Sequence, residues 1–424
     1  MTKIHCNNTV DGAEEHSKVT REYSFKAKNR FTTFLYSKPL LILVCTITLL
    51  SFCYLDFSPL LEKIIRIMAV FLDGTVFLFY LFQKKFTKQS LLLLAIFAIE
   101  LLSTIIGKDA SIKNFILLYI RLLGFYSYLE TGFRLFTKRT VSTLSKVLFV
   151  LVFINWLTIV IFPSGLYLSE LYTTNWFFLY DNMHIIWYLA AICISYINHE
   201  INNTKRYNLA ILLFLTTYSV IFCLSANSIV AYAILLFYLV FANFLNKSKI
   251  LNYKSYLVTF ILANISFVFL RVQEWFSWFI VELLGKSLTF TGRTVIWDKA
   301  LNYIAARPIL GYGLEPSSVI AYKLGNVHYT HAHNTLLDIT YKGGLVSSFL
   351  FMVMLFSLRR SLEKCIDTKI RNFLSIVLFC LMLMMVFEAR QEKIGFYIII
   401  AAASCAQYFL SKTMKSPTKS ETQL

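Results

Sequence analysis

Three of the chain's seven histidines fall within six positions, in the stretch HYTHAHNTLLDITYKGG from His328 to Gly344. The spacing His-x2-His-x-His could present His328, His331 and His333 to zinc, because imidazole nitrogens are common ligands of that metal. One imidazole could instead take a proton from a hydroxyl, because its ordinary pKa lies near neutrality. No acidic residue lies within the cluster, so we favour acid–base chemistry, and we expect no metal.

Charged residues elsewhere could complete such a site. Arg293 stands in GRTVIW, and Glu388, Arg390 and Lys393 stand in FEARQEKIG. An arginine fork can bind two oxygens of a carboxylate or a phosphate group, so Arg293 could bind an anionic group of a substrate. Glu388 could orient a histidine or contact a sugar. The alternatives are a loop arginine that lies along the membrane surface and an ordinary charged turn between two helices.

The composition indicates what must position these residues. Of 424 residues, 57% are hydrophobic and 15% charged, whereas a soluble domain carries about a quarter charged residues. The chain is therefore expected to be an all-α polytopic membrane protein. Its net charge of +18 does not indicate nucleic-acid binding, because Lys and Arg fall mostly in short loops between apolar runs. The eight cysteines lie mostly in apolar runs and predict no disulfide framework.

About twelve apolar runs are long enough to span a bilayer. They are residues 40–56, 64–82, 90–106, 112–130, 144–162, 182–197, 207–224, 227–245, 255–271, 335–358, 371–387 and 394–411. The distribution of Lys and Arg places both termini in the cytoplasm.

The predicted membrane spans and their orientation divide the chain into five parts. We expect a basic cytoplasmic tail (1–39), nine transmembrane helices (40–271), a large extracytoplasmic loop (272–334), three more helices (335–411) and a second cytoplasmic tail (412–424). A loop of about sixty residues usually has a function or its own structure. Three charges lie inside spans, namely Asp73, Glu100 and Arg121. For these we expect a structural ion pair involving Arg121, with a proton or ion path as the alternative.

The stretch from Gly292 to Gly344 resembles the O-antigen ligase and polymerase superfamily. It contains GRTVIW, then PILGYG, then His333-Asn334 followed after nine residues by Gly344. The resemblance implies a GT-C-like membrane glycosyltransferase that is metal-independent, inverting and free of cofactors. Such an enzyme takes a glycan from undecaprenyl diphosphate at the outer face of the bacterial cytoplasmic membrane. His333 would be the base and Arg293 would hold the diphosphate.

This sequence also departs from the family pattern. Many members carry a Ser-Arg pair at the outer end of a central helix, but here Ser225 is followed by Ala226 and Asn227. A second phosphate-binding cation must then come from elsewhere, or the substrate is held differently. The residues expected to bind substrate are Arg271, His331, Asn334, Glu388, Arg390 and Lys393.

The preferred function is polymerisation of undecaprenyl-diphosphate-linked oligosaccharide repeat units into a capsule, exopolysaccharide or O-antigen. A ligase that transfers the finished glycan to another acceptor would share the same chemistry. A flippase or transporter of lipid-linked sugar is the alternative from another class, but transporters show related halves and polar sites at mid-membrane. The expected partners are the lipid-linked oligosaccharide and the bilayer, with a flippase and a chain-length regulator as further candidates.

Overall fold

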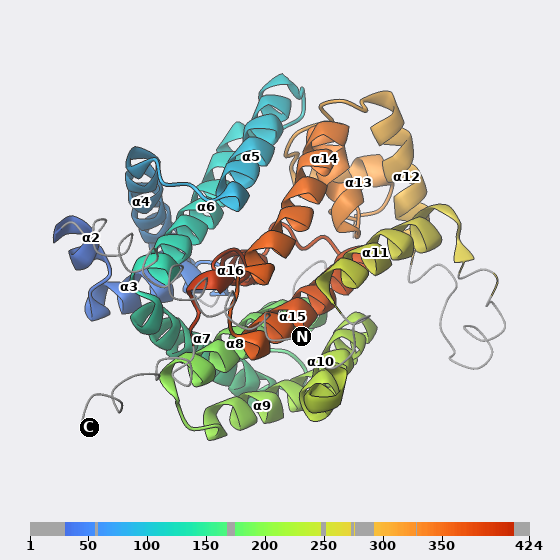
Figure 1. Cartoon of the computed structure of the whole chain (residues 1–424). Coiled ribbons are helices and arrows are strands. Elements are labelled where there is room, and N and C mark those ends of the chain that lie inside the picture. Colours follow the sequence, from blue (N-terminus) through green and yellow to red (C-terminus); the bar gives the residue numbers. More distant parts are fainter. Residues whose placement is uncertain are drawn as a thin grey trace, which may run out of the picture.

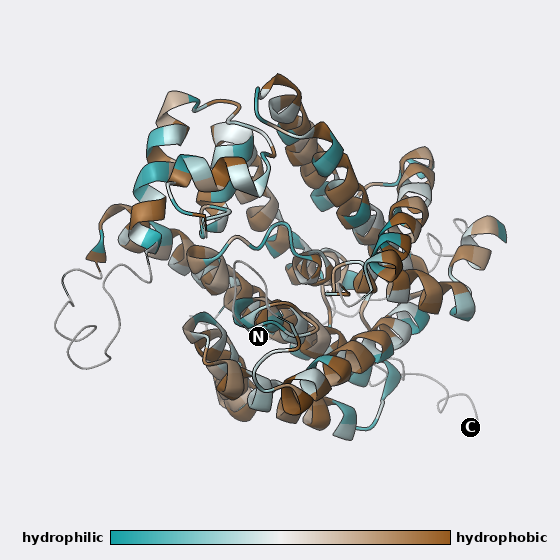
Figure 2. Cartoon of the chain, turned by 180° about the vertical axis from the view of Figure 1, so that it is seen from behind, coloured by the Kyte–Doolittle hydropathy of each residue, from teal (hydrophilic) through white to brown (hydrophobic). Residues whose placement is uncertain are grey.

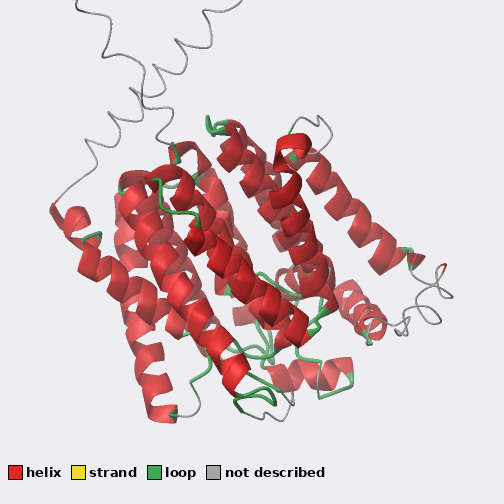
Figure 3. Cartoon of the chain, turned by 90° about the horizontal axis from the view of Figure 1, so that it is seen from below, coloured by secondary structure: helices red, strands yellow, loops and turns green. Residues whose placement is uncertain are grey.

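The computed structural model describes residues 30–55, 58–167, 174–246, 252–272, 275, 292–327 and 329–410. His328, residues 1–29 of the predicted N-terminal tail, most of residues 273–291 and the C-terminal tail lie outside these residues. Within them the regular structure is helical, with isolated β-bridges besides the loops and turns, and the helices pack side by side (Figure 3). The class predicted from composition, an all-α membrane protein, is confirmed.

A helix occupies each of the twelve predicted spans. These are α3 (Lys38–Leu50), α4 (Pro59–Gln83), α5 (Lys88–Ile106), α6 (Ile112–Leu135), α7 (Thr137–Ile161), α8 (Asp181–Asn202), α9 (Tyr207–Cys223), α10 (Ala226–Leu245), α11 (Tyr253–Asn264) with its π-helical end (Ile265–Phe269), α14 (Thr335–Glu363), α15 (Thr368–Phe387) and α16 (Ile394–Ser404). Of the helices in the described chain, α4, α5, α7, α10, α14 and α15 are long and apolar enough to cross a membrane. The number of twelve spans therefore stays a prediction.

Four further helical segments complete the described chain: α2 (Arg30–Leu35), α12 (Arg293–Ala306), α13 (Ser317–Leu324) and a 3-10 turn (Ala406–Tyr408). The helices α12 and α13 lie together beside α14 (Figure 1). They are less hydrophobic than the long helices, which are mainly apolar (Figure 2). The predicted large loop therefore contains helices of its own.

Two sets of hydrogen bonds join segments at or next to the ends of the predicted spans. One set joins segments that were predicted to be cytoplasmic: Arg134 Nη1 to the Lys85 carbonyl (2.7 Å), Arg139 Nη1 to the Tyr36 carbonyl (3.0 Å) and Asn372 Nδ2 to Asn246 Oδ1 (3.0 Å). The other joins segments predicted to be outside: Ser111 N to the Leu314 carbonyl (2.8 Å), Tyr54 N to the Phe177 carbonyl (3.0 Å) and Thr335 Oγ1 to the Glu388 carbonyl (2.8 Å). Each set brings together segments assigned to one side of the membrane.

Arg121 and Asp73, two of the charged residues inside the predicted spans, bind uncharged groups. Arg121 donates to the Ser51 carbonyl at 3.0 Å and lies over the Phe52 ring at 4.6 Å. Asp73 accepts from the Thr48 hydroxyl at 2.9 Å. Arg121 forms no direct ion pair within the described residues, because a backbone carbonyl and an aromatic face receive its guanidinium, but it lies close enough to Asp73 for their charges to attract.

Candidate functional site

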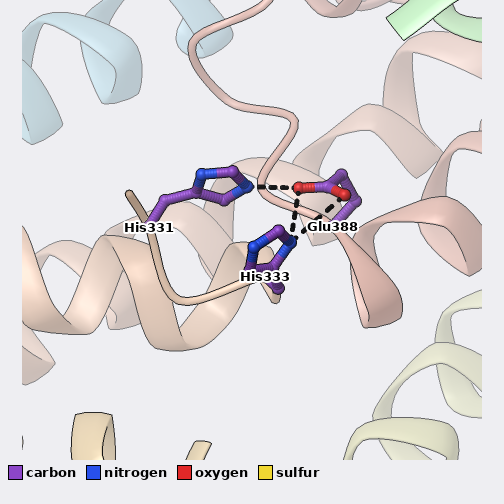
Figure 4. A group of neighbouring side chains, drawn as sticks. All are labelled: His331, His333 and Glu388. Atoms are coloured by element: carbon purple, nitrogen blue, oxygen red, sulfur yellow. Dashed lines mark hydrogen bonds and ion pairs between the residues drawn. The ribbon is translucent and has the colours of Figure 1, made fainter. Parts of the chain in front are cut away.

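Two imidazoles and one carboxylate meet where the segment before α14 faces the turn between α15 and α16 (Figure 4). His331 Nε2 hydrogen-bonds Glu388 Oε1, and His333 Nδ1 lies 3.2 Å from the same oxygen. The two imidazole rings are 4.0 Å apart between centroids. Glu388 is fully buried, whereas the side chains of His331 and His333 are 15% and 14% exposed. We call His331, His333 and Glu388 the His–Glu cluster.

Asn334 fixes this segment to the start of α14. Its side-chain oxygen caps the helix by accepting from Leu337 N at 2.9 Å. Its Nδ2 donates to Asn264 Oδ1 and to the Val386 carbonyl, both at 2.8 Å. Because Asn334 is fully buried and its polar atoms are bound inside the protein, its position favours an anchoring role over the predicted contact with substrate.

The backbone around the cluster is held in an uncommon conformation. His333 has φ +46°, which few residues other than glycine adopt. Thr335 connects the two segments of the site, since its hydroxyl donates to the Glu388 carbonyl at 2.8 Å and accepts from Arg390 N at 3.0 Å. Strained backbone of this kind persists where surrounding contacts enforce it, and it gathers at functional sites.

The spacing from Asn334 to Gly344 has a structural cause. Gly344 breaks α14 with φ +68° and ψ −172°, which leaves carbonyls of the preceding turn free to accept other donors. The carbonyls of Tyr341 and Lys342 accept from Tyr312 N and Gly313 N, both at 2.8 Å. The segment PILGYG thus docks on the break, and it positions α12 and α13 beside α14.

Arg293 lies beside the His–Glu cluster. It is the first residue of α12, and its Nη2 is 3.7 Å from Glu388 Oε2. Its side chain keeps 18% of its surface exposed. The structure therefore brings Arg293 to the His–Glu cluster, although the two are far apart in sequence.

Arg271, which was expected to bind substrate as a second cation, already has partners inside the protein. Arg271 bonds Asp298 and the Thr294 carbonyl, and it lies over the Trp297 ring at 5.5 Å. Its charge is therefore already met by Asp298. Ser225 bonds Asn182, and Asn227 Nδ2 donates to the Met384 carbonyl at 3.4 Å, so neutral groups occupy the position of the missing Ser-Arg pair.

Arg390 is the stronger candidate. It is fully buried, and Nη1 contacts Met183 Sδ at 4.0 Å. Its Nε and Nη2 have no hydrogen-bond partner within the described part of the chain. Burial lowers the pKa of Arg390, and the nearby Glu388 opposes that shift. A buried cation with unused donors is costly, and an anion would satisfy it. Lys393, whose pKa burial also lowers, lies farther along the same turn.

Electrostatics set the protonation states of the cluster. Burial by itself would raise the pKa of Glu388, but His333 and His331 outweigh it and hold that pKa well below its usual range. Burial and the neighbouring His331 lower the pKa of His333. Near neutral pH, Glu388 is therefore ionised and His333 is neutral. When Nδ1–H of His333 donates to Glu388, the lone pair of Nε2 is available to a proton.

A buried network that sequence reasoning missed supports both segments. Asp338 accepts from Ala332 N at 3.2 Å and from Lys342 Nζ at 2.6 Å. Gln391 also donates to Asp338, and Lys342 also bonds Glu392. The i,i+4 spacing of Asp338 and Lys342 was a usable signal, because such residues share one helix face.

The same three residues could also hold a metal. One ligand atom from each of His331, His333 and Glu388 lies within 4.8 Å of the others, and this donor set suits zinc. Arg293 opposes that use, because its guanidinium lies 3.7 Å from the same carboxylate and would repel a divalent cation. The geometry therefore fits a hydrogen-bonded histidine better than a metal ligand.

Fold and site together define a multi-pass helical membrane protein with a histidine, carboxylate and arginine site between connecting segments. Residues 211–352 match the family model described as O-Antigen ligase. The match covers about a third of the chain, and it supports the resemblance to the O-antigen ligase and polymerase superfamily that the motifs indicated. The match includes Arg293, His331 and His333, whereas Glu388 and Arg390 lie outside it. No curated protein matches the chain.

Proposed function

We propose that the protein polymerises undecaprenyl-diphosphate-linked oligosaccharide repeat units into a surface polysaccharide. The reaction takes place at the outer face of the bacterial cytoplasmic membrane and needs no metal. The observation that carries this proposal is the position of His333, which shares a buried, ionised Glu388 with His331 and lies beside Arg293. A base, a carboxylate that orients it and a cation are the groups that glycosyl transfer from a diphosphate requires.

His333 acts as the general base. Its Nε2 takes the proton from the attacking hydroxyl of the acceptor sugar, while Nδ1–H stays bound to Glu388. The hydroxyl oxygen forms a bond to the anomeric carbon of the donor, and the bond from that carbon to the diphosphate breaks. A positioned base contributes roughly 10²–10⁴-fold to such a reaction. A single displacement inverts the anomeric configuration.

Arginines receive the leaving group. The bonding electron pair departs with undecaprenyl diphosphate, whose negative charge must be met in a medium of low dielectric. Arg293 is partly exposed beside the cluster, and Arg390 has unused donors beneath it. Arg271 contributes less, because Asp298 already binds it.

Ligation of a finished glycan to another acceptor is the second candidate. The description of the matching family favours it, and it uses the same base and cations. The two reactions differ only in the acceptor hydroxyl. A flippase for lipid-linked sugar would require no base beside the arginine.

The test uses purified protein and undecaprenyl-diphosphate-linked repeat units. We expect longer lipid-linked glycans and free undecaprenyl diphosphate, with no loss of activity in EDTA. The variants His333→Ala and Arg293→Ala should lose activity by about a hundredfold or more, whereas Lys146→Gln, at an exposed position of α7, should be unaffected.

Three results would contradict parts of the proposal. Full activity in both site variants would remove the site assignment. EDTA inhibition that zinc reverses would restore the metal alternative. Transfer to a distinct acceptor without chain growth would identify a ligase, and translocation without any transfer would identify a flippase.

A further inference from the structure

Two adjoining cavities lie on the α4–α6 side of the site. The first, of about 500 Å³, lies between the end of α3, α6, the start of α8 and the turn before α16. The second, of about 920 Å³, lies between α4 and α6 beside residues 314–317. Arg66, Leu118 and Arg121 line both cavities, so the two form one continuous hollow. We call it the α4–α6 cavity.

The α4–α6 cavity has an excess of positive charge. Its lining contains Lys63, Arg66, Lys113, Arg121 and Lys393. Its three carboxylates already have cationic partners, because Glu62 binds Arg66, Glu315 binds Lys323, and Glu392 binds Lys342. None of the other four cations forms an ion pair within the described chain. Arg66 lies close enough to Arg121 for their charges to repel. An anionic ligand would relieve this repulsion.

The same cavity has an apolar wall. Ile67, Val70 and Phe71 of α4 line it opposite Leu117 and Leu118 of α6. Phe71 is 72% exposed and Ile67 is 60% exposed. Because α4 is long and apolar enough to cross a membrane, this face lies toward lipid. A ligand with an anionic head and a long hydrocarbon chain matches both parts of the cavity.

The cavity adjoins the candidate active site. Glu392 and Lys393, which line it, belong to the same turn as Glu388. Met183 also lines it, and its sulfur contacts Arg390 at 4.0 Å. A head group bound at Arg121 would therefore lie on the Met183 side of Arg390, and a glycan attached to it could extend toward His333.

We propose that the α4–α6 cavity binds the diphosphate and the adjoining isoprenoid chain of a lipid-linked glycan. Arg121, Lys63, Lys113 and Lys393 bind the diphosphate, and the wall of Ile67, Phe71 and Leu117 contacts the hydrocarbon. This inference rests on the proposed function and identifies where its lipid substrate lies. The lipid in this cavity is the acceptor, because the diphosphate of the donor is bonded to the reacting anomeric carbon and must lie beside His333 and Arg293.

Binding is measured with purified protein in nanodiscs and labelled undecaprenyl diphosphate. We expect Arg121→Gln and the double variant Lys63→Gln with Lys113→Gln to weaken binding by about tenfold each, because each loses charge-assisted contacts. The matched control is Arg360→Gln, at an exposed position outside the cavity. Excess phosphatidylglycerol should compete weakly. Equal competition would show a general anionic-lipid site and overturn the proposal.

Kinetics separate this inference from the proposed function. The cavity variants should raise KM for the lipid-linked glycan by about tenfold and change kcat less, whereas His333→Ala should abolish turnover and bind the lipid normally. Normal binding and KM in the cavity variants would overturn the cavity assignment even if polymer forms. Specific binding without any transfer would overturn the proposed function alone.

A soluble sugar acceptor then distinguishes the two roles of the lipid. If the cavity instead held the donor, Arg121→Gln would lower transfer from the lipid-linked glycan to this acceptor, and that result would overturn the assignment. If the cavity holds the acceptor lipid, only chain growth falls. A photoreactive residue in place of Phe71 should crosslink the isoprenoid chain, and its failure to do so in a folded, active protein would remove the apolar part of the proposal.

Discussion

One buried carboxylate organises the charged side chains of the candidate site. Glu388 contacts His331, His333 and Arg293, so its negative charge is shared among three potential cations. The sequence indicated Glu388 and each of its three partners as candidates, because of their residue types and positions. It could not decide which histidine shares which oxygen, because the two segments are more than fifty positions apart and only their packing brings them together.

The pH dependence of the reaction tests the base at this scale. His333 must be neutral to accept a proton, so kcat/KM should fall as the pH decreases through its pKa. Because burial and His331 lower that pKa, this decrease should lie below about pH 6.5, the usual value of histidine. The measurement is a profile of kcat/KM against pH.

The variant Glu388→Gln tests how the carboxylate affects this base. Glu388 raises the pKa of His333, so its removal should move the acidic limb to still lower pH and reduce the rate by about a hundredfold or more. Glu363→Gln, which changes only an exposed pair with Arg359, should leave the profile unchanged. An acidic limb above pH 7 in the wild type would contradict His333 as the base.

At the scale of elements, the break in α14 at Gly344 explains how the segment from Pro308 to Gly313 comes to pack against this helix. Asn334 caps the helix, Gly344 interrupts it, and the segment from Pro308 to Gly313 docks on the interruption. The sequence predicted the helix and the turn separately. Their contact could not be predicted, because it depends on carbonyls that only the break in the helix leaves available.

Gly344→Ala tests this docking. A Cβ at this position would lie 1.9 Å from the Ile309 carbonyl oxygen, and φ +68° disfavours any side chain. We expect a loss of about 1–3 kcal/mol or more in stability together with loss of activity, measured by thermal unfolding in detergent and by turnover. Gly74→Ala should be mild, because its Cβ would meet only the flexible end of Ile120. Equal effects of both substitutions would show that docking at Gly344 is unimportant.

At the scale of the molecule, the charge pattern predicts that one end of the bundle faces the cytoplasm. Segments that share contacts at each end of the helices are those that the threading placed on one side. The threading also places α12 and the His–Glu cluster outside the cell.

Cysteine labelling in intact cells checks this orientation. Asn302→Cys, at an exposed position of α12, should react with a membrane-impermeant maleimide. Lys205→Cys, exposed between α8 and α9, should react only after the membrane is opened. Native cysteines of the described chain lie mainly buried, and the unsubstituted protein gives the background. The reverse pattern of labelling would invert the topology.

The sequence by itself determined the all-α membrane class, the positions of the helices and the residues with useful chemistry. These follow from the lengths of apolar runs and from local spacing, which act within one segment of chain. Only the tertiary structure decided that Glu388 joins both histidines, that Asp298 binds Arg271, that Ser51 rather than a carboxylate binds Arg121, and that cations gather between α4 and α6. These contacts depend on how distant helices pack, and no local pattern encodes that packing.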